Sequence, residues 1–330
     1  MTNKREYAFD ALRVIAMIMV VVIHVANVYT RSFSSISSSS YVVSLIFSTF
    51  SRVSVPIFFM ISGALLLDRK FDTKKYLKRI KKFIILIIVW DLVYLIWEYL
   101  FLGVTHDNLL KLIKEPYRAH LWFLYTILLI YILQPLLRIV LNKLNKPIKY
   151  IILIAWLSLS IIGVMGIIKL PGVFSTLTHI GYFIMGKYLY DFSKSKDLRK
   201  FTIFFIIVII VCVGLSVYLN YTTSLARNHF YKGYLGYRTP FLIFSSFAFY
   251  LMVLANFKKD SLSNKVMILS EVSLGVYLIH GIFLDITKVL FDYGSVNSII
   301  GIPILSTIIF IFSVASVYYL KKIKLLKDLL

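Results

Sequence analysis

Ten apolar runs, most of them as long as a membrane-spanning helix, constrain this chain more than any other feature. A helix needs about 20 mostly apolar residues to cross the hydrocarbon core of a bilayer. The runs occupy residues 9–29, 41–67, 83–102, 120–141, 150–168, 178–190, 201–221, 238–257, 266–290 and 299–320. Backbone polar groups in lipid must be hydrogen-bonded within their own segment, so such runs predict helices. The sequence therefore predicts an all-α, polytopic membrane protein with about ten transmembrane helices.

The composition excludes the other broad classes of protein. Hydrophobic residues make up 59% of the chain and charged residues 16%, whereas soluble domains average about 45–50% and about 25%. An ordinary soluble enzyme is therefore excluded, and 26 Phe and 23 Tyr exclude a disordered chain. The single cysteine, Cys212, lies inside an apolar run, so no intramolecular disulfide is possible and we interpret it as a packing residue.

Basic residues gather between the apolar runs and predict the orientation of the chain. Lys and Arg number 37 against 15 Asp and Glu, a net charge of +22. In a soluble protein this charge would suggest nucleic acid as a partner. With the N-terminus inside, the inner segments hold 24 Lys or Arg and the outer segments hold 7. The positive-inside rule then predicts that both termini are cytoplasmic, and we expect a lipid bilayer rather than nucleic acid as the partner.

The chain is expected to be a single membrane domain over residues 1–330, with no fused extracytoplasmic domain. The first run is too long for a signal peptide and contains Arg13 and His24, so we interpret it as a transmembrane helix. The serine-rich stretch 34–40 predicts a short outer loop, and the sequence shows no repeat or linker.

Two ionisable side chains share one face of the first predicted helix. Arg13 and His24 are eleven residues apart, about three turns plus 20°, and Asp10, Met17 and Asn27 fall on the same face. Charged groups in hydrocarbon are costly, which makes them candidates for a functional site. The alternative is that Arg13 extends toward the cytoplasmic surface and His24 is a hydrogen-bonded core histidine.

A proline interrupts the second predicted helix beside an arginine. Pro56 has no N–H to donate to the carbonyl of Arg52, so we expect a kink that leaves this carbonyl free near the guanidinium. The following Ser62 and Gly63 permit close approach of another helix. An arginine that extends out of the membrane at a simple proline kink is the alternative.

Four ionisable groups are predicted to lie at one depth. Counting about 1.5 Å per residue from each cytoplasmic boundary places His24, Arg52, Glu98 and His280 about 21–23 Å into the membrane. This common level predicts a shared site, in which Arg52 and Glu98 form an ion pair. Asp91, two turns before Glu98, lies on the same face of its helix.

Two further clusters lie at helix ends. His120, Trp122 and Tyr125 begin the fourth run on the predicted outer side, as an aromatic belt or as part of an acceptor site. The inner segment 68–82 holds eight basic residues, among them Lys78, Arg79 and Lys82. It serves either attraction to anionic lipid or recognition of a cytoplasmic phosphate. We expect no metal.

Five motifs together resemble those of one family of membrane enzymes. They are Asp10-x2-Arg13-x10-His24, Arg52-Val-Ser-Val-Pro56 to Ser62-Gly63, Tyr76-Leu-Lys-Arg-Ile-Lys-Lys82, His120-Leu-Trp-Phe, and Ser273-Leu-Gly275-Val-Tyr277-Leu-Ile-His280. This ordered set resembles the acyltransferase-3 family of membrane acyltransferases. The second and fourth motifs look most like the enterobacterial common antigen O-acetyltransferase branch.

The resemblance implies an activity and a set of site residues. It implies an O-acyltransferase, an O-acetyltransferase in particular, of the bacterial cytoplasmic membrane. Such a protein moves an acyl group from cytoplasmic acyl-CoA to a hydroxyl of a cell-envelope glycan or lipid-linked sugar. Arg13 and His24 would form the catalytic signature, with Arg52 nearby. Lys78, Arg79 and Lys82 stand where the family has an arginine pair that meets CoA, and Lys82 departs from that pattern. Acetyl-CoA is then a co-substrate, and no cofactor is permanently bound.

Physical chemistry suggests roles for these residues and leaves alternatives open. His24 serves as a general base toward the acceptor hydroxyl or as a transient acyl carrier. Arg52 or His280 could stabilise an oxyanion, and Glu98 or Asp91 could orient an imidazole. A secondary transporter of a small polar metabolite is the alternative function, because transporters also bury such groups beside broken helices. The sequence shows no inverted copy of the Arg13–His24 helix, which favours the acyltransferase.

Overall fold

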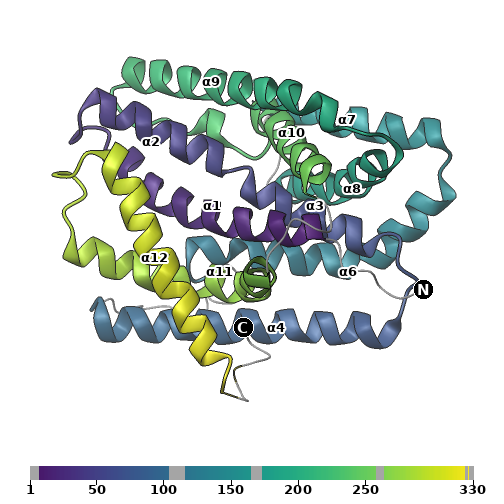
Figure 1. The fold of residues 1–330 in the computed structure, drawn as a ribbon, viewed down its shortest axis with the longest axis horizontal. Coiled ribbons are helices and arrows are strands. Elements are labelled where there is room, and N and C mark those ends of the chain that lie inside the picture. The colour runs from purple at the N-terminus through teal and green to yellow at the C-terminus, as the bar shows by residue number, and fades with distance from the viewer. Residues whose placement is uncertain (1–6, 104–115, 165–172, 258–263, 324–325, 327–330) are drawn as a thin grey trace.

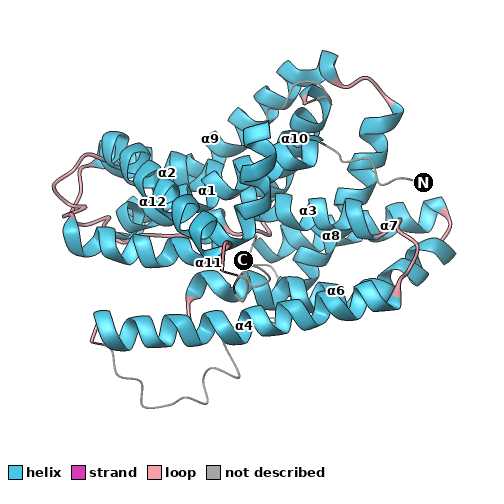
Figure 2. Ribbon diagram, turned by 60° about the horizontal axis from the view of Figure 1, so that its bottom comes forward, coloured by secondary structure: helices cyan, strands magenta, loops and turns pink. Residues whose placement is uncertain are grey.

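In the structure, which is a computed structural model, each predicted apolar run is helical along most of its described residues; the run 41–67 forms two helices, and residues 165–168 of the run 150–168 lie outside the described residues. It describes residues 7–103, 116–164, 173–257, 264–323 and 326, and within these ranges there is no strand (Figure 2). The helices are α1 (Tyr7–Arg31), α2 (Ser38–Ser51), α3 (Ser54–Leu66), α4 (Thr73–Phe101), α6 (Trp122–Lys143), α7 (Lys146–Val164), α8 (Val173–Ser195), α9 (Thr202–Arg227), α10 (Pro240–Asn256), α11 (Asn264–Leu290) and α12 (Ser298–Leu320). Short 3₁₀ turns, η1 (Ala119–Leu121), η2 (Arg199–Phe201) and η3 (Gly233–Leu235), precede α6, α9 and α10.

The helix lengths fit a membrane. By length and composition, eight helical stretches in the described ranges can cross a bilayer, with α2 and α3 together forming one of them. The run 178–190, the shortest predicted from the sequence, lies inside the 23-residue helix α8. The prediction of an all-α polytopic membrane protein is confirmed, and the cytoplasmic placement of the termini stays a prediction.

Helix α1 lies in the middle of the bundle, and α4 and α9 lie at its edges (Figure 1). Two apolar clusters meet on α1: Leu12 and Ala16 belong to one, Met17 and Val21 to the other. The outer face of α9 is apolar and exposed, through Ile203, Phe204, Ile207, Ile210, Val211 and Tyr218. Such a surface is favourable in contact with lipid tails and unfavourable in contact with water, because hydration of apolar groups costs free energy.

The second predicted span is broken at Arg52 and Val53. Helix α2 ends at Ser51 and α3 begins at Ser54, so the interruption lies just before Pro56, as its missing N–H predicts. The expectation that the Arg52 carbonyl stays free is wrong, because it accepts a hydrogen bond from the backbone N–H of Val55 at 3.4 Å. A tighter turn replaces the lost helical bond.

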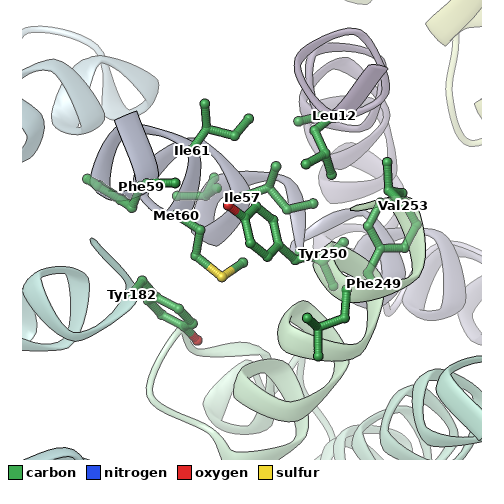
Figure 3. Packing of buried hydrophobic residues seen from close by; sticks show 14 of the residues in the cluster. Leu12, Ile57, Phe59, Met60, Ile61, Tyr182, Phe249, Tyr250 and Val253 are labelled. Atoms are coloured by element: carbon green, nitrogen blue, oxygen red, sulfur yellow. The ribbon is translucent and has the colours of Figure 1, made fainter. Parts of the chain in front are cut away.

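Two glycines bring α3 and α8 into direct backbone contact. A Cβ on Gly63 would collide with the backbone of Phe183, and one on Gly186 would collide with the backbone of Met60. Small residues allow such an approach in a membrane, where packing replaces the hydrophobic effect between helices. Around this contact lies the larger apolar cluster, in which α1, α3, α8 and α10 contribute Leu12, Ile57, Phe59, Met60, Ile61, Tyr182, Phe249, Tyr250 and Val253 (Figure 3).

Candidate active site

Three histidines from separate parts of the chain lie together beside α1. The ring centroids of His24 and His280 are 4.9 Å apart, those of His120 and His280 are 5.0 Å apart, and those of His24 and His120 are 5.9 Å apart. Gly281, next to His280, has no room for a side chain, because a Cβ there would lie 2.9 Å from Cε1 of His120. No group of three or more His, Cys, Asp or Glu side chains among the described residues is arranged to hold a metal ion.

The hydrogen bonds of this cluster fix one tautomer. Nδ1 of His280 lies 2.7 Å from the carbonyl oxygen of Tyr277, and a carbonyl can only accept, so Nδ1 carries the proton. In the neutral imidazole Nε2 then has a lone pair. Nε2 of His280 and Nε2 of His120 are both buried and lack a hydrogen-bond partner within the described residues. Buried polar atoms are normally paired, so these two nitrogens are available to a bound substrate or to a neighbouring ring of the cluster.

Arg52 acts on this site through Asn27. The guanidinium Nη2 of Arg52 donates to Oδ1 of Asn27 at 3.1 Å, and the Ser48 hydroxyl donates to the same oxygen at 3.1 Å. The Tyr237 hydroxyl also interacts with this guanidinium. Two donors on Oδ1 fix the amide, which leaves the Nδ2 donors of Asn27 for the cavity that this residue lines, one turn from His24.

A polar cavity of about 520 Å³ opens beside the three histidines on the predicted outer side. Its wall comes from the end of α1, the segment before α6, and α11. Besides the imidazoles it includes Asn27, Arg31, Arg118, Asp285 and Lys288. We call it the outer cavity. It combines proton acceptors with cations, a combination that can bind and deprotonate a polar substrate.

A second cavity, of about 260 Å³, lies toward the predicted inner side and is mostly apolar. Arg13, Arg69 and Arg79 line it, together with the hydroxyl groups of Ser62, Tyr131, Ser273 and Tyr277. Arg13 pairs with Asp10 at 3.0 Å, and the guanidinium of Arg79 lies 5.3 Å from the ring centre of Tyr131. We call it the inner cavity. Three guanidiniums around an apolar channel can hold a polyanion with a long apolar arm.

The two cavities approach each other along α1. Val20 lines the inner cavity and His24 lines the outer one, so one helical turn, about 5.4 Å, separates the two walls. Phe123 and Tyr277, whose ring centroids are 5.4 Å apart, are among the residues that line the inner cavity, and the Tyr277 hydroxyl donates to the carbonyl of His120. The Tyr277 ring, which lines the inner cavity, therefore lies close to two histidines of the outer one, with centroids 6.1 Å from His120 and 6.1 Å from His280.

The predicted pairing of Arg52 with Glu98 is wrong. Glu98 instead pairs with Arg118, with Oε1 and Nη1 2.7 Å apart, and accepts a hydrogen bond from the Tyr117 hydroxyl at 2.8 Å. Arg118 also pairs with Asp285. The reason is the neighbourhood of α4, which packs against α6 and α11 and not against the α2–α3 break. Glu98 therefore belongs to the ion pairs next to the outer cavity.

The other predicted site residues divide between the two cavities and the surrounding protein. Arg13 and Arg79 line the inner cavity, and His24, His120 and His280 line the outer one. Lys78 is exposed and Lys82 is partly buried, and neither is among the described residues that line the inner cavity. Trp122 stacks near His179 and Tyr237, with centroids 5.0 and 5.5 Å away. Tyr125 donates to Asp91, which also accepts from the backbone N–H of Tyr117.

Sequence reasoning missed several residues of these walls. Arg118 lies two residues before His120, so its place at the start of the fourth motif was the available signal. Periodicity had already placed Asn27 on the face of Arg13 and His24, and it also places Arg31 there, seven residues after His24. Asp285 and Lys288 follow His280 by five and eight residues, about 140° and 80° around the helix, so periodicity alone does not place them beside it.

The comparison with protein families gives a match along nearly the whole chain. The acyltransferase-3 family model, which describes an acyltransferase domain, matches residues 6–321. No curated protein and no solved structure matches the chain. The matched range contains every residue that lines the inner and outer cavities.

Proposed function

Because this chain belongs to the acyltransferase-3 family, we propose that it acetylates a hydroxyl of a cell-envelope glycan or lipid-linked sugar, with cytoplasmic acetyl-CoA as the donor. One observation carries the proposal: an arginine-lined cavity and a histidine cluster lie one helical turn apart on α1. The protein would then reside in the bacterial cytoplasmic membrane, with the inner cavity open to the cytoplasm.

The inner cavity suits the donor. The phosphates of CoA would bind at Arg13, Arg69 and Arg79, which the cytoplasmic orientation places at the inner mouth. The pantetheine arm is long and only weakly polar, so it fits the apolar wall that continues toward Phe123 and Tyr277. This position brings the thioester to the histidines while the charged part of CoA stays outside the hydrocarbon.

We assign His24 the role of general base. In the proposed step the acceptor hydroxyl attacks the thioester carbonyl carbon, and His24 takes the hydroxyl proton. The C–S bond then breaks, the CoA thiolate leaves, and it takes the proton from the imidazolium. The Nδ2 donors of Asn27 would stabilise the oxyanion that forms at the carbonyl oxygen. His280, whose Nε2 has a lone pair, would accept a hydrogen bond from the His24 ring and orient it.

Two alternatives use the same residues differently. His24 could carry the acetyl group as a transient acetyl-imidazole before the acceptor takes it. Acid quenching followed by mass spectrometry of the peptide that contains His24 distinguishes this route. On the covalent route, that peptide carries an additional acetyl mass before acceptor is added. A transporter is not favoured, because the family match describes an acyltransferase domain.

The test of the proposed function combines a reconstituted and a cellular measurement. Purified full-length protein in nanodiscs should release free CoA thiol from acetyl-CoA when an extract of envelope glycans is added. In parallel, mass spectrometry of envelope glycans from a deletion strain should show the loss of an acetyl mass that the wild-type gene restores. Glycans that keep all their acyl groups in the deletion strain, together with no thiol release, would contradict the proposal.

A further inference from the structure

The outer cavity holds more positive charge than general-base chemistry requires. Arg31, Arg118 and Lys288 line it beside the histidines. The outer segments of a membrane protein are normally poor in such residues, and the sequence follows that rule with 7 Lys or Arg outside against 24 inside. Three cations around one outer cavity therefore call for an explanation other than topology.

Two carboxylates balance only part of this charge. Glu98 and Asp285 both pair with Arg118, and Asp285 also pairs with Lys288, with Nζ and Oδ1 3.3 Å apart. In the part of the chain that the structure describes, no carboxylate pairs with Arg31. Two cations and two carboxylates cancel, and Arg31 leaves the wall with a net positive charge.

The geometry places this charge at a defined distance from the chemistry. Arg31 lies seven residues after His24, which is two turns and about 10 Å farther out on the same face of α1. Lys288 lies eight residues after His280, a similar distance along α11. The Lys288 side chain is 44% exposed, so a ligand can reach its ammonium group. Each cation thus lies about two turns beyond one imidazole of the cluster.

We propose that the outer cavity binds an acceptor that carries an oxyanion, a phosphate or a carboxylate, held by Arg31 and Lys288 while its hydroxyl lies at His24. This inference rests on the proposed function and names the class of its acceptor. Arg31 would supply paired N–H donors to the oxyanion, and Lys288 a point charge. Arg118, held by Glu98 and Asp285, forms the floor of this subsite and keeps α11 next to the segment before α6. A neutral glycan would leave the charge of Arg31 unmatched.

The experiment uses the full-length protein in phosphatidylcholine nanodiscs with saturating acetyl-CoA, which fills the inner cavity. The probes are glucose 1-phosphate and glucose, which differ in the oxyanion. We expect glucose 1-phosphate, but not glucose, to raise the melting temperature. Arg31→Gln should weaken this binding about 10-fold or more, as the loss of a charge-assisted hydrogen bond predicts. Lys288→Gln should weaken it as well. Arg227→Gln, which removes an outer charge away from the cavity, is the matched control and should leave it unchanged.

A second arm distinguishes a soluble anion from a lipid headgroup. Replacement of part of the phosphatidylcholine by phosphatidylglycerol, without added sugar, tests the headgroup source. An Arg31-dependent rise in melting temperature there identifies a lipid as the carrier of the oxyanion, and a rise only with glucose 1-phosphate identifies a soluble or glycan-borne one.

The outcomes separate this inference from the proposed function. Equal binding of glucose and glucose 1-phosphate in both lipid mixtures, or binding that survives Arg31→Gln and Lys288→Gln, overturns the oxyanion subsite even where acetyl-CoA is still consumed. Arg31-dependent binding of glucose 1-phosphate supports the subsite. If no acetyl-CoA is consumed with any acceptor, the proposed function fails, and that result is read from thiol release and not from melting temperature.

Discussion

The inner and outer cavities differ in the ionisable groups that line them. The wall of the inner cavity holds three arginines and several hydroxyl groups but no imidazole and no carboxylate. The wall of the outer cavity holds three imidazoles, and its cations are partly neutralised by Glu98 and Asp285. The inner cavity can recognise phosphate but has no group suited to take a proton near neutral pH. In the proposed function, the inner cavity would therefore bind the donor and the outer cavity would carry out proton transfer.

The sidedness of the two cavities gives the largest expected effect, because labelling is all-or-none. Ser37 precedes α2 near the outer cavity's side of the bundle, and Lys74 lies in the first turn of α4 near the inner one. In a Cys212→Ser background, Ser37→Cys should react with an impermeant thiol reagent in intact cells, and Lys74→Cys should react only after lysis. Equal labelling of both positions in intact cells would mean that the assignment of inner and outer is wrong.

Removal of His24 should affect the outer cavity alone. His24→Ala and His24→Gln should lower acetyl transfer about 10²–10⁴-fold, because a positioned base is lost. Acetyl-CoA affinity should stay near the wild-type value, because His24 does not line the inner cavity. His229→Gln, in an exposed outer loop, is the control. If His24→Ala kept more than about a tenth of wild-type turnover, His24 would not be the base.

The stability of the protein should depend on the ion pair of Glu98 with Arg118 and not on an interaction of Glu98 with Arg52. Arg118→Leu leaves Glu98 and Asp285 without their shared cation, and loss of one partner from a buried pair costs about 3–5 kcal/mol. Adding Glu98→Gln and Asp285→Asn should recover part of that loss in thermal melting. A double-mutant cycle on Arg52 and Glu98 should give coupling below about 0.5 kcal/mol, since they share no contact. Strong coupling in that cycle would contradict the ion pairs described here.

The smallest effects concern the inner cavity. Arg79→Gln should weaken acetyl-CoA binding about 10-fold, because Arg79 lines the cavity and would lose a charge-assisted contact with phosphate. Lys78→Gln, one residue away but exposed, should change it little. Higher salt should reduce the difference between the two variants, because partly exposed contacts are screened. Equal affinities of both variants in nanodiscs would remove Arg79 from the donor site.

The helices could be predicted well from the sequence because the length of an apolar run decides whether it forms a membrane helix. A run of about 20 apolar residues has few alternatives to a membrane helix, so each predicted run is helical along most of its described residues, although the break at Arg52 and Val53 divides one run into two helices. The face shared by Arg13 and His24 also follows from helical periodicity, although the structure divides that face between two cavities. Periodicity within one helix therefore grouped residues that line the two cavities.

Contacts between helices were harder to predict. Counting residues from a boundary gives the depth of Glu98 but not the neighbours of α4, and the guanidinium nearest to it comes from Arg118, outside the apolar runs. For the basic segment, net charge drew attention to Lys78 and Lys82 equally with Arg79, while the side of α4 that faces the cavity depends on packing. The partner of Glu98 and the position of Arg79 at the inner cavity both depend on tertiary contacts and not on local pattern.

The single turn of α1 between the two cavities has an electrical consequence. In the proposed reaction the acyl group crosses that turn outward, formally as an acyl cation that leaves the CoA thiolate. The proton of the acceptor hydroxyl returns across it, through His24, to that thiolate. One positive charge moves each way, so no net charge crosses the membrane. The membrane potential, which contributes about 2.3 kcal/mol per elementary charge per 100 mV, therefore adds nothing to the free energy of the transfer. The equilibrium of the transfer would therefore be the same in an energised and in a depolarised membrane.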